Sequence, residues 1–171
     1  VCSSDLEILG IYGQNGSGKT AIVDALYFLQ KVMVGADLDQ SLEDYMTIDS
    51  DTAEIFADFN IFMDGIVFEI GYTLSLSREE KEIVINREIL RSAKNENGIR
   101  TNKTIFMDYQ RDQTDVIFKP QKRLDEILEA NKEIKTDLIV ARKMAEKSNC
   151  SYIFGESSRE IFCKIGRASC R

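Results

Sequence analysis

Residues 13–20 read Gly-Gln-Asn-Gly-Ser-Gly-Lys-Thr and match the pattern Gly-x4-Gly-Lys-[Ser/Thr] at every fixed position. A loop that holds the phosphates of a nucleotide needs several backbone N–H groups directed into one concavity, which side chains would obstruct. Gly13, Gly16 and Gly18 carry no such obstruction and allow backbone angles that other residues avoid. The stretch therefore predicts a phosphate-binding loop.

The last two residues of the loop have separate predicted roles. Lys19 would place its ammonium group on the β- and γ-phosphates and offset the charge that builds up in phosphoryl transfer, and the Thr20 hydroxyl would ligate Mg²⁺. The first N–H groups and the dipole of the following helix would favour the same anion. We expect the cofactor-binding residues to be Gly13, Gln14, Asn15, Gly16, Ser17, Gly18, Lys19 and Thr20.

The residues around the loop supply the context that the motif requires. Residues 7–12 are typical of a short buried strand. After the loop, apolar residues recur at helical spacing, namely Ile22, Ala25, Leu26, Leu29, Val32 and Met33. The alternative, a glycine-rich turn formed by chance, does not explain this strand–loop–helix order. We assign it to residues 7–34.

Beyond a polar, acidic connection the period changes from helical to alternating. Ala53, Ile55, Ala57, Phe59 and Ile61 share one face of a predicted strand, and Asp64-Gly65 predicts a hairpin turn to a second strand over residues 66–77. Further strands are expected at 82–91, 103–109 and 115–119. Residues 53–119 thus predict an antiparallel meander of about five strands.

Pro120 ends the predicted meander, and residues 121–163 form a helical part. Leu124, Ile127 and Leu128 indicate one helix, and residues 134–145 indicate another. A short strand is expected at 149–154, and a last element begins at 158. The predicted fold class is therefore α/β with an α+β appearance.

The two ends of the chain resemble translated halves of a short-read sequencing adapter, at residues 1–6 and 164–171. We expect 7–163 to be the biological segment, a piece of a longer protein that stops before its catalytic half. Without the ends, the 22 basic and 29 acidic residues fall to 19 and 28, a net charge of −9. This charge disfavours the segment as a nucleic-acid clamp in its own right.

Composition excludes several classes of site. The chain has no His, so His-based catalysis and His-ligated metal are absent from this segment, and Cys150 and Cys163 lack metal-ligand spacing. No apolar stretch approaches the ~20 residues of a membrane span, and residues 1–6 are not a signal peptide. We expect a cytoplasmic protein with no membrane partner.

Two common phosphate-loop classes do not fit. Small-molecule kinases usually alternate strands and helices after the loop, whereas this chain predicts a long meander. GTP-binding proteins read their base with Asn-Lys-x-Asp, and the two Asn-Lys pairs here have Ile105 and Ile134 at the fourth position.

Residues 8–26, above all the run Asn-Gly-Ser-Gly-Lys at 15–19, resemble the ABC-class ATPase heads. That group includes RecF-like and SMC-like proteins and the bacterial "AAA family ATPases" related to the OLD family, and the strand at 68–74 is similar to it as well. The resemblance implies the N-terminal lobe of such a head, with ATP and Mg²⁺ as cofactors. It also implies a homodimer that sandwiches two ATP molecules, ATP hydrolysis by the full-length protein, and a DNA-directed or phage-defence activity with an effector nuclease.

The chain departs from that group in its catalytic motifs. Asp64 and Asp108 follow apolar runs but lack the glutamate that would orient the attacking water, and no Ser-Gly-Gly signature is present. Gln110, Gln113 and residues 155–158 are weak candidates for the Gln loop. No residue of this segment is therefore assigned to catalysis. Two alternatives stay open: the nucleotide-binding subunit of a transporter, and an ATP-binding switch without hydrolysis.

If the two ends are not part of the domain, deleting residues 1–6 and 164–171 will leave the melting temperature unchanged. Thermal unfolding of the trimmed and complete chains measures this. A clear drop in the trimmed chain would show that the ends belong to the folded structure.

Overall fold

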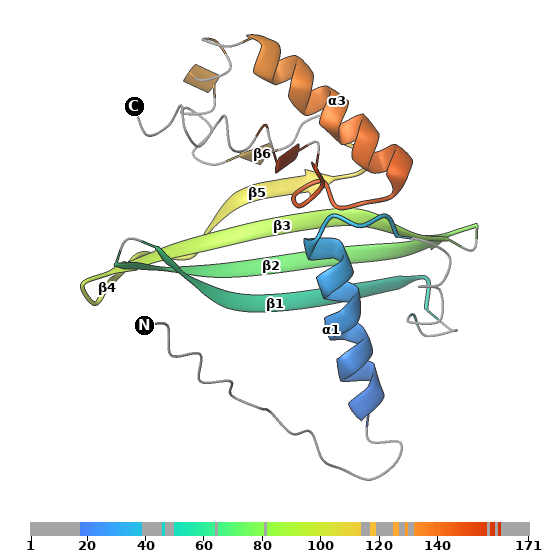
Figure 1. The fold of residues 1–171 in the computed structure, drawn as a ribbon, viewed down its shortest axis with the longest axis horizontal. Coiled ribbons are helices and arrows are strands. Elements are labelled where there is room, and N and C mark those ends of the chain that lie inside the picture. The colour runs from blue at the N-terminus through green and yellow to red at the C-terminus, as the bar shows by residue number, and fades with distance from the viewer. Residues whose placement is uncertain are drawn as a thin grey trace, which may run out of the picture.

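The structure is a computed structural model, and it describes residues 18–38, 46, 50–63, 65–80, 82–113, 117–118, 125–126, 129, 132–156, 158–159 and 161. The predicted strand at 7–12, most of the loop and both chain ends lie outside these residues. In the described part, one antiparallel sheet carries two long helices (Figure 1). No helix there is both long and apolar enough to cross a membrane.

The sheet confirms the predicted meander. Its strands follow each other in the order β1-β2-β3-β5-β6, every neighbouring pair is antiparallel, and the short β4 pairs with the end of β3. The strands are β1 (Thr52–Met63), β2 (Ile66–Glu79), β3 (Glu82–Glu96), β4 (Ile99–Arg100), β5 (Thr104–Gln110) and β6 (Ile117–Phe118). Sequential antiparallel pairing needs only short connections, so the order along the chain becomes the order in space.

Two turns set the lengths of the strands. Met63 pairs with Ile66 across the predicted Asp64-Gly65 turn, and Gly65 has a φ of 76°. Asn97 and Gly98 both have positive φ, at 52° and 80°, as a two-residue hairpin turn requires. The second turn extends β3 beyond the predicted 82–91 and creates β4, which the sequence did not predict.

Two predicted helices agree with the structure in place, and one expected strand is wrong. The helix predicted at Leu124, Ile127 and Leu128 has these three residues outside the described part of the chain. Helix α1 spans Lys19–Met33 and helix α3 spans Lys132–Ser148. Residues 149–154, expected as a strand, form a turn instead. The reason is a hydrogen-bond acceptor on the sheet, described next, which binds their backbone N–H groups in place of a neighbouring strand.

That acceptor is Glu88 of β3, which has no exposed surface. A β-bulge puts it there: Ser75 pairs with Arg87 while Leu76 pairs with Ile85, so Asn86 is an extra residue. Beyond the bulge the side-chain alternation shifts by one, and Glu88 takes a core position opposite Leu74. Its carboxyl group accepts hydrogen bonds from the hydroxyls of Tyr72 (2.6 Å) and Ser151 (2.5 Å) and from the Tyr152 N–H (2.7 Å).

Residues 149–155, which we call the anchoring turn, join the sheet to the segment that follows α1. The Asn149 side-chain amide donates to the carbonyl of Ile83 on β3 (2.6 Å) and to that of Leu38 (3.2 Å). The Leu38 N–H donates in return to the Asn149 carbonyl (2.9 Å). Both helices and the sheet share one apolar core, whose buried members are Phe28, Val32, Leu38, Met46, Tyr72, Leu74, Leu76, Ile83, Ile85, Met107, Tyr109, Ile134, Ala141, Ala145, Tyr152, Ile153 and Ile161.

Two glycines test the contact between α1 and the anchoring turn. Gly35 and Gly65 have similar positive φ values, 73° and 76°, but a Cβ on Gly35 would lie 2.7 Å from the Phe154 carbonyl oxygen, whereas one on Gly65 would meet nothing within 4 Å. We expect Gly65→Ala to cost about 1 kcal/mol of unfolding free energy. Gly35→Ala should cost about 1 to 3 kcal/mol more, because the backbone must move. Denaturant unfolding measures both, and equal losses would show that the turn does not pack there.

Candidate nucleotide-binding site

The start of α1 has the backbone conformation that the loop motif requires. Gly18 precedes the helix with φ 81° and ψ 10°, in the left-handed region. A Cβ at this position would meet nothing within 4 Å, so the conformation, rather than space, favours glycine. The helix then begins at Lys19, and the Ile22 N–H donates to the Gly18 carbonyl (3.3 Å).

The first turn of α1 is suited to an anion. The first N–H groups of an α-helix have no acceptor inside the helix, and the residue before α1, Gly18, has no side chain to cap them. The first turn also contains no acidic residue. Lys19 is half-buried and Thr20 is exposed at this end. Backbone donors, the positive end of the helix dipole, an ammonium and a hydroxyl thus lie within one turn.

The described residues include part of the predicted site. Gly18, Lys19 and Thr20 are consecutive at the helix start, as the motif demands. Gly13, Gln14, Asn15, Gly16 and Ser17 lie outside the described residues, so their predicted phosphate contacts stay predictions.

Helix α1 is held at its C-terminal half. Phe28 and Val32 are buried, whereas Ile22 and Leu26 are 49% and 59% exposed. In Figure 1 the N-terminal half of α1 extends beyond β1, the edge strand of the described sheet. An open groove of about 700 Å³ lies between α1 and β1, and its lining is apolar except for Asp58. It offers phosphate groups no cation, so we do not place the nucleotide phosphates in it.

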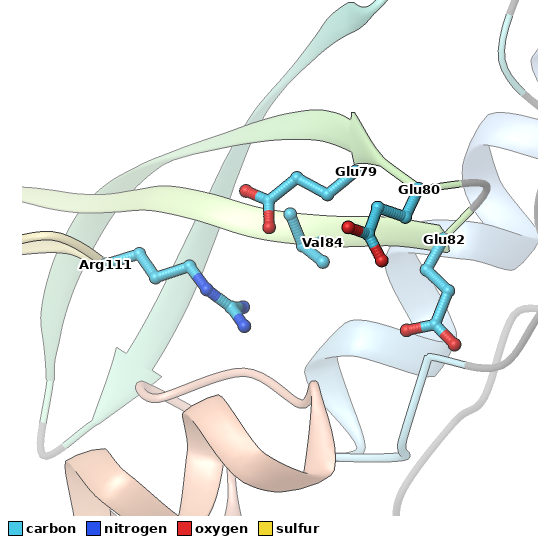
Figure 2. A pocket seen from close by; sticks show the side chains of 5 residues that line it. All are labelled: Glu79, Glu80, Glu82, Val84 and Arg111. Carbon is cyan, nitrogen blue, oxygen red and sulfur yellow. The ribbon is translucent and has the colours of Figure 1, made fainter.

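A second hollow, of about 570 Å³, has the wrong charge for phosphate. Figure 2 shows the carboxylates of Glu79, Glu80 and Glu82 around it, with Arg111 approaching from the opposite wall. Three carboxylates repel a polyphosphate more than one guanidinium attracts it. Within the described part of the chain, no group of three or more acidic or Cys residues is arranged to hold a metal ion.

Asp108, one of the two aspartates considered for catalysis, does not lie at α1. Asp108 lies within β5 and accepts two hydrogen bonds from Arg87, at 2.8 and 2.7 Å. It points to the side of the sheet opposite Met107 and Tyr109, which are in the core with α1. Asp64 lies outside the described residues. The Gln110 carbonyl accepts from the Arg142 side chain of α3 (3.0 Å) and from the Gln113 N–H (3.2 Å), so this region serves packing.

Comparison with known proteins matches the chain to a protein family. Residues 8–142 match the model of the family described as "AAA domain, putative AbiEii toxin, Type IV TA system". Searches of curated proteins and of solved structures gave no match.

The fold and this match define the class of protein, a phosphate-loop ATPase domain of mixed α/β structure. The match covers most of the chain, from the predicted first strand into α3. The chain therefore belongs to the AAA-domain family with that description, a family of nucleotide-binding ATPase domains.

The position of Asp108 gives a prediction about Mg²⁺. Asp108→Asn should leave the affinity for Mg-ATP unchanged and lower the unfolding free energy by about 1 kcal/mol or less, because it breaks an ion pair with a partly exposed arginine. Calorimetric titration and denaturant unfolding measure the two quantities. A large loss of Mg²⁺-dependent nucleotide affinity would instead make Asp108 a ligand of the metal.

Proposed function

We propose that this domain binds Mg-ATP at the N-terminal end of α1. The observation that carries the proposal is the placement of Gly18, Lys19 and Thr20. A glycine in the left-handed backbone conformation precedes α1, and the lysine and threonine of the motif are the first two residues of the helix. The family match supports ATP as the nucleotide, because its model describes an AAA domain.

In the bound state, residues 13–18 would wrap the phosphates with backbone N–H groups. Lys19 would contact the β- and γ-phosphates, and Thr20 would be a ligand of Mg²⁺. The dipole of α1 would add a further favourable interaction with the anion. The metal would offset the remaining phosphate charge.

In a full-length protein of the ABC-ATPase type, we propose that two such domains close face to face on two ATP molecules and hydrolyse them. Closure would then drive a DNA-directed or phage-defence activity, with an effector nuclease as the partner. The long antiparallel sheet directly after α1 supports this arrangement over the kinase type. A transporter subunit is the alternative that uses the same lobe.

For the chain as given, binding without turnover is the activity favoured by the structure. Asp108 forms an ion pair with Arg87, and its side chain lies on the side of the sheet opposite α1. Asp108 therefore offers no catalytic carboxylate to Thr20. Such a domain would hold ATP as a structural switch.

Lys19→Ala should weaken Mg-ATP binding about 10- to 150-fold, because the loss of a charge-assisted contact to phosphate costs about 1.5 to 3 kcal/mol. Lys31→Ala is the matched control, since Lys31 lies in the last turn of the same helix. Its affinity should equal that of the original chain. Calorimetric titration measures both affinities, and circular dichroism confirms folding. Unchanged affinity in Lys19→Ala would overturn the assignment of the site.

A further inference from the structure

Glu88 is a buried acid surrounded by hydrogen-bond donors. One oxygen, Oε1, lies 2.6 Å from the Tyr72 hydroxyl and 2.5 Å from the Ser151 hydroxyl. The other, Oε2, lies 2.7 Å from the Tyr152 N–H and 3.4 Å from the Ile153 N–H. None of these four partners carries a positive charge.

The two oxygens face different kinds of donor. A backbone N–H can only donate, so Oε2 must accept in every state. Each hydroxyl can donate or accept. A proton on Oε1 therefore needs only one hydroxyl to turn, so the site can hold the neutral acid. The carboxylate has four hydrogen-bond donors but, among the described residues, no bonded cation to offset its charge. Ser151 is held for this role by the Phe154 N–H, which donates to its hydroxyl oxygen (2.9 Å).

Glu88 is the carboxylic acid in a cluster of buried titratable groups that otherwise consists of tyrosines and a thiol. Burial raises the pKa of Glu88 above its ordinary value of 4.5, and its hydrogen bonds oppose this rise. Burial likewise raises the pKa of Tyr72 on β2, of Tyr109 on β5, and of Cys150 and Tyr152 in the anchoring turn. All four therefore stay neutral.

The charged groups of the neighbouring elements act on those tyrosines and on the thiol. On α3, Arg142 bonds to Glu146 (2.8 Å), and both charges influence Tyr109. Asp37, which follows α1, and Glu88 both act on Cys150. Arg111 of the β5 end also acts on Tyr109. Among the described residues no guanidinium or ammonium bonds to Glu88, so its ionisation puts an unpaired charge into the core.

The anchoring turn extends this effect to α1. Asn149 exchanges hydrogen bonds with Leu38, and Phe154 packs against Gly35. Gly35 and Leu38 lie just beyond the C-terminal end of α1. The N-terminal half of α1 is largely exposed. The C-terminal end is thus the main attachment of the helix to the described fold.

We propose that Glu88 is a proton-operated latch: the neutral acid keeps the anchoring turn docked on the sheet, and ionisation releases the turn and loosens the attachment of α1. When the turn undocks, water reaches the carboxyl group and its pKa returns toward the ordinary value. Docking is therefore fully stabilised below about pH 4.5. That stabilisation is lost as the pH rises through the raised pKa of the docked state.

Hydrogen exchange of the amides in residues 149–155 tests the latch in the complete, nucleotide-free chain. After correction for the intrinsic rates, the opening equilibrium should increase with pH by up to about tenfold per unit within this window and then level off. Glu88→Gln should remove the pH dependence and keep the turn protected. Its amide oxygen can accept from the backbone N–H groups, and its NH₂ group can donate to the hydroxyls.

Glu69→Gln is the matched control, because Glu69 pairs with Arg100 on an exposed part of the sheet (2.5 Å) and should retain the original profile. Ser151→Ala is a second test that leaves the acid in place. The Ser151 hydroxyl lowers the pKa of Glu88, so its removal should move the exchange profile to higher pH. A pH-independent profile in the original chain, the same slope in Glu88→Gln, or an unmoved profile in Ser151→Ala would overturn the latch.

The effect on α1 rests on the proposed function and is measured separately. Titration with Mg-ATP at pH 5 and at pH 8 gives the affinity that each chain loses as the pH rises. This loss should be at least about fivefold greater in the original chain than in Glu88→Gln. Equal losses with an intact exchange profile would overturn the coupling to α1. Failure of the original chain to bind Mg-ATP at either pH would overturn the nucleotide site, while the exchange data still decide the latch.

Discussion

The hydrogen bonds of one buried carboxyl group join the parts of this domain. Glu88 lies in the core because a single extra residue, Asn86, shifts the alternation of β3. Its acceptor oxygens then bind the turn that follows α3, and this turn binds the segment that follows α1. A polar group of this kind is costly to bury unless its partners are in place. The bulge, the turn and the helix therefore form one unit.

The nucleotide site depends on that unit through α1. The helix presents its first turn away from the described fold and is packed at its other end by Phe28 and Val32. Residues that bind phosphate must be accessible, while the helix that carries them must be held in position. The division of α1 into an exposed N-terminal half and a buried C-terminal half satisfies both needs.

Strong local patterns made much of the fold predictable. The alternation in 53–77 and the two turns with glycine specify the hairpins, and the apolar spacing after Gly18 specifies α1. Glu88 could not be predicted, because strict alternation from Ile83 and Ile85 would place Arg87 inward instead. The turn at 149–154 differs from the predicted strand because its backbone N–H groups bond to the Glu88 side chain, which is far away in the sequence. At the site, the motif predicted a helix that begins at the Lys-Thr pair, and α1 does begin at Lys19. The phosphate and Mg²⁺ contacts of Lys19 and Thr20 stay predictions.

A backbone NMR titration with Mg-ATP tests the central claim most directly, because it reports every amide of the folded chain at once. Binding at the predicted site requires the largest shifts in residues 13–20, including Gly18, Lys19 and Thr20 at the start of α1. The acidic hollow around Glu79, Glu80 and Glu82 should not respond. Shifts centred on that hollow, or on the groove beside β1, with the start of α1 unaffected, would contradict the account.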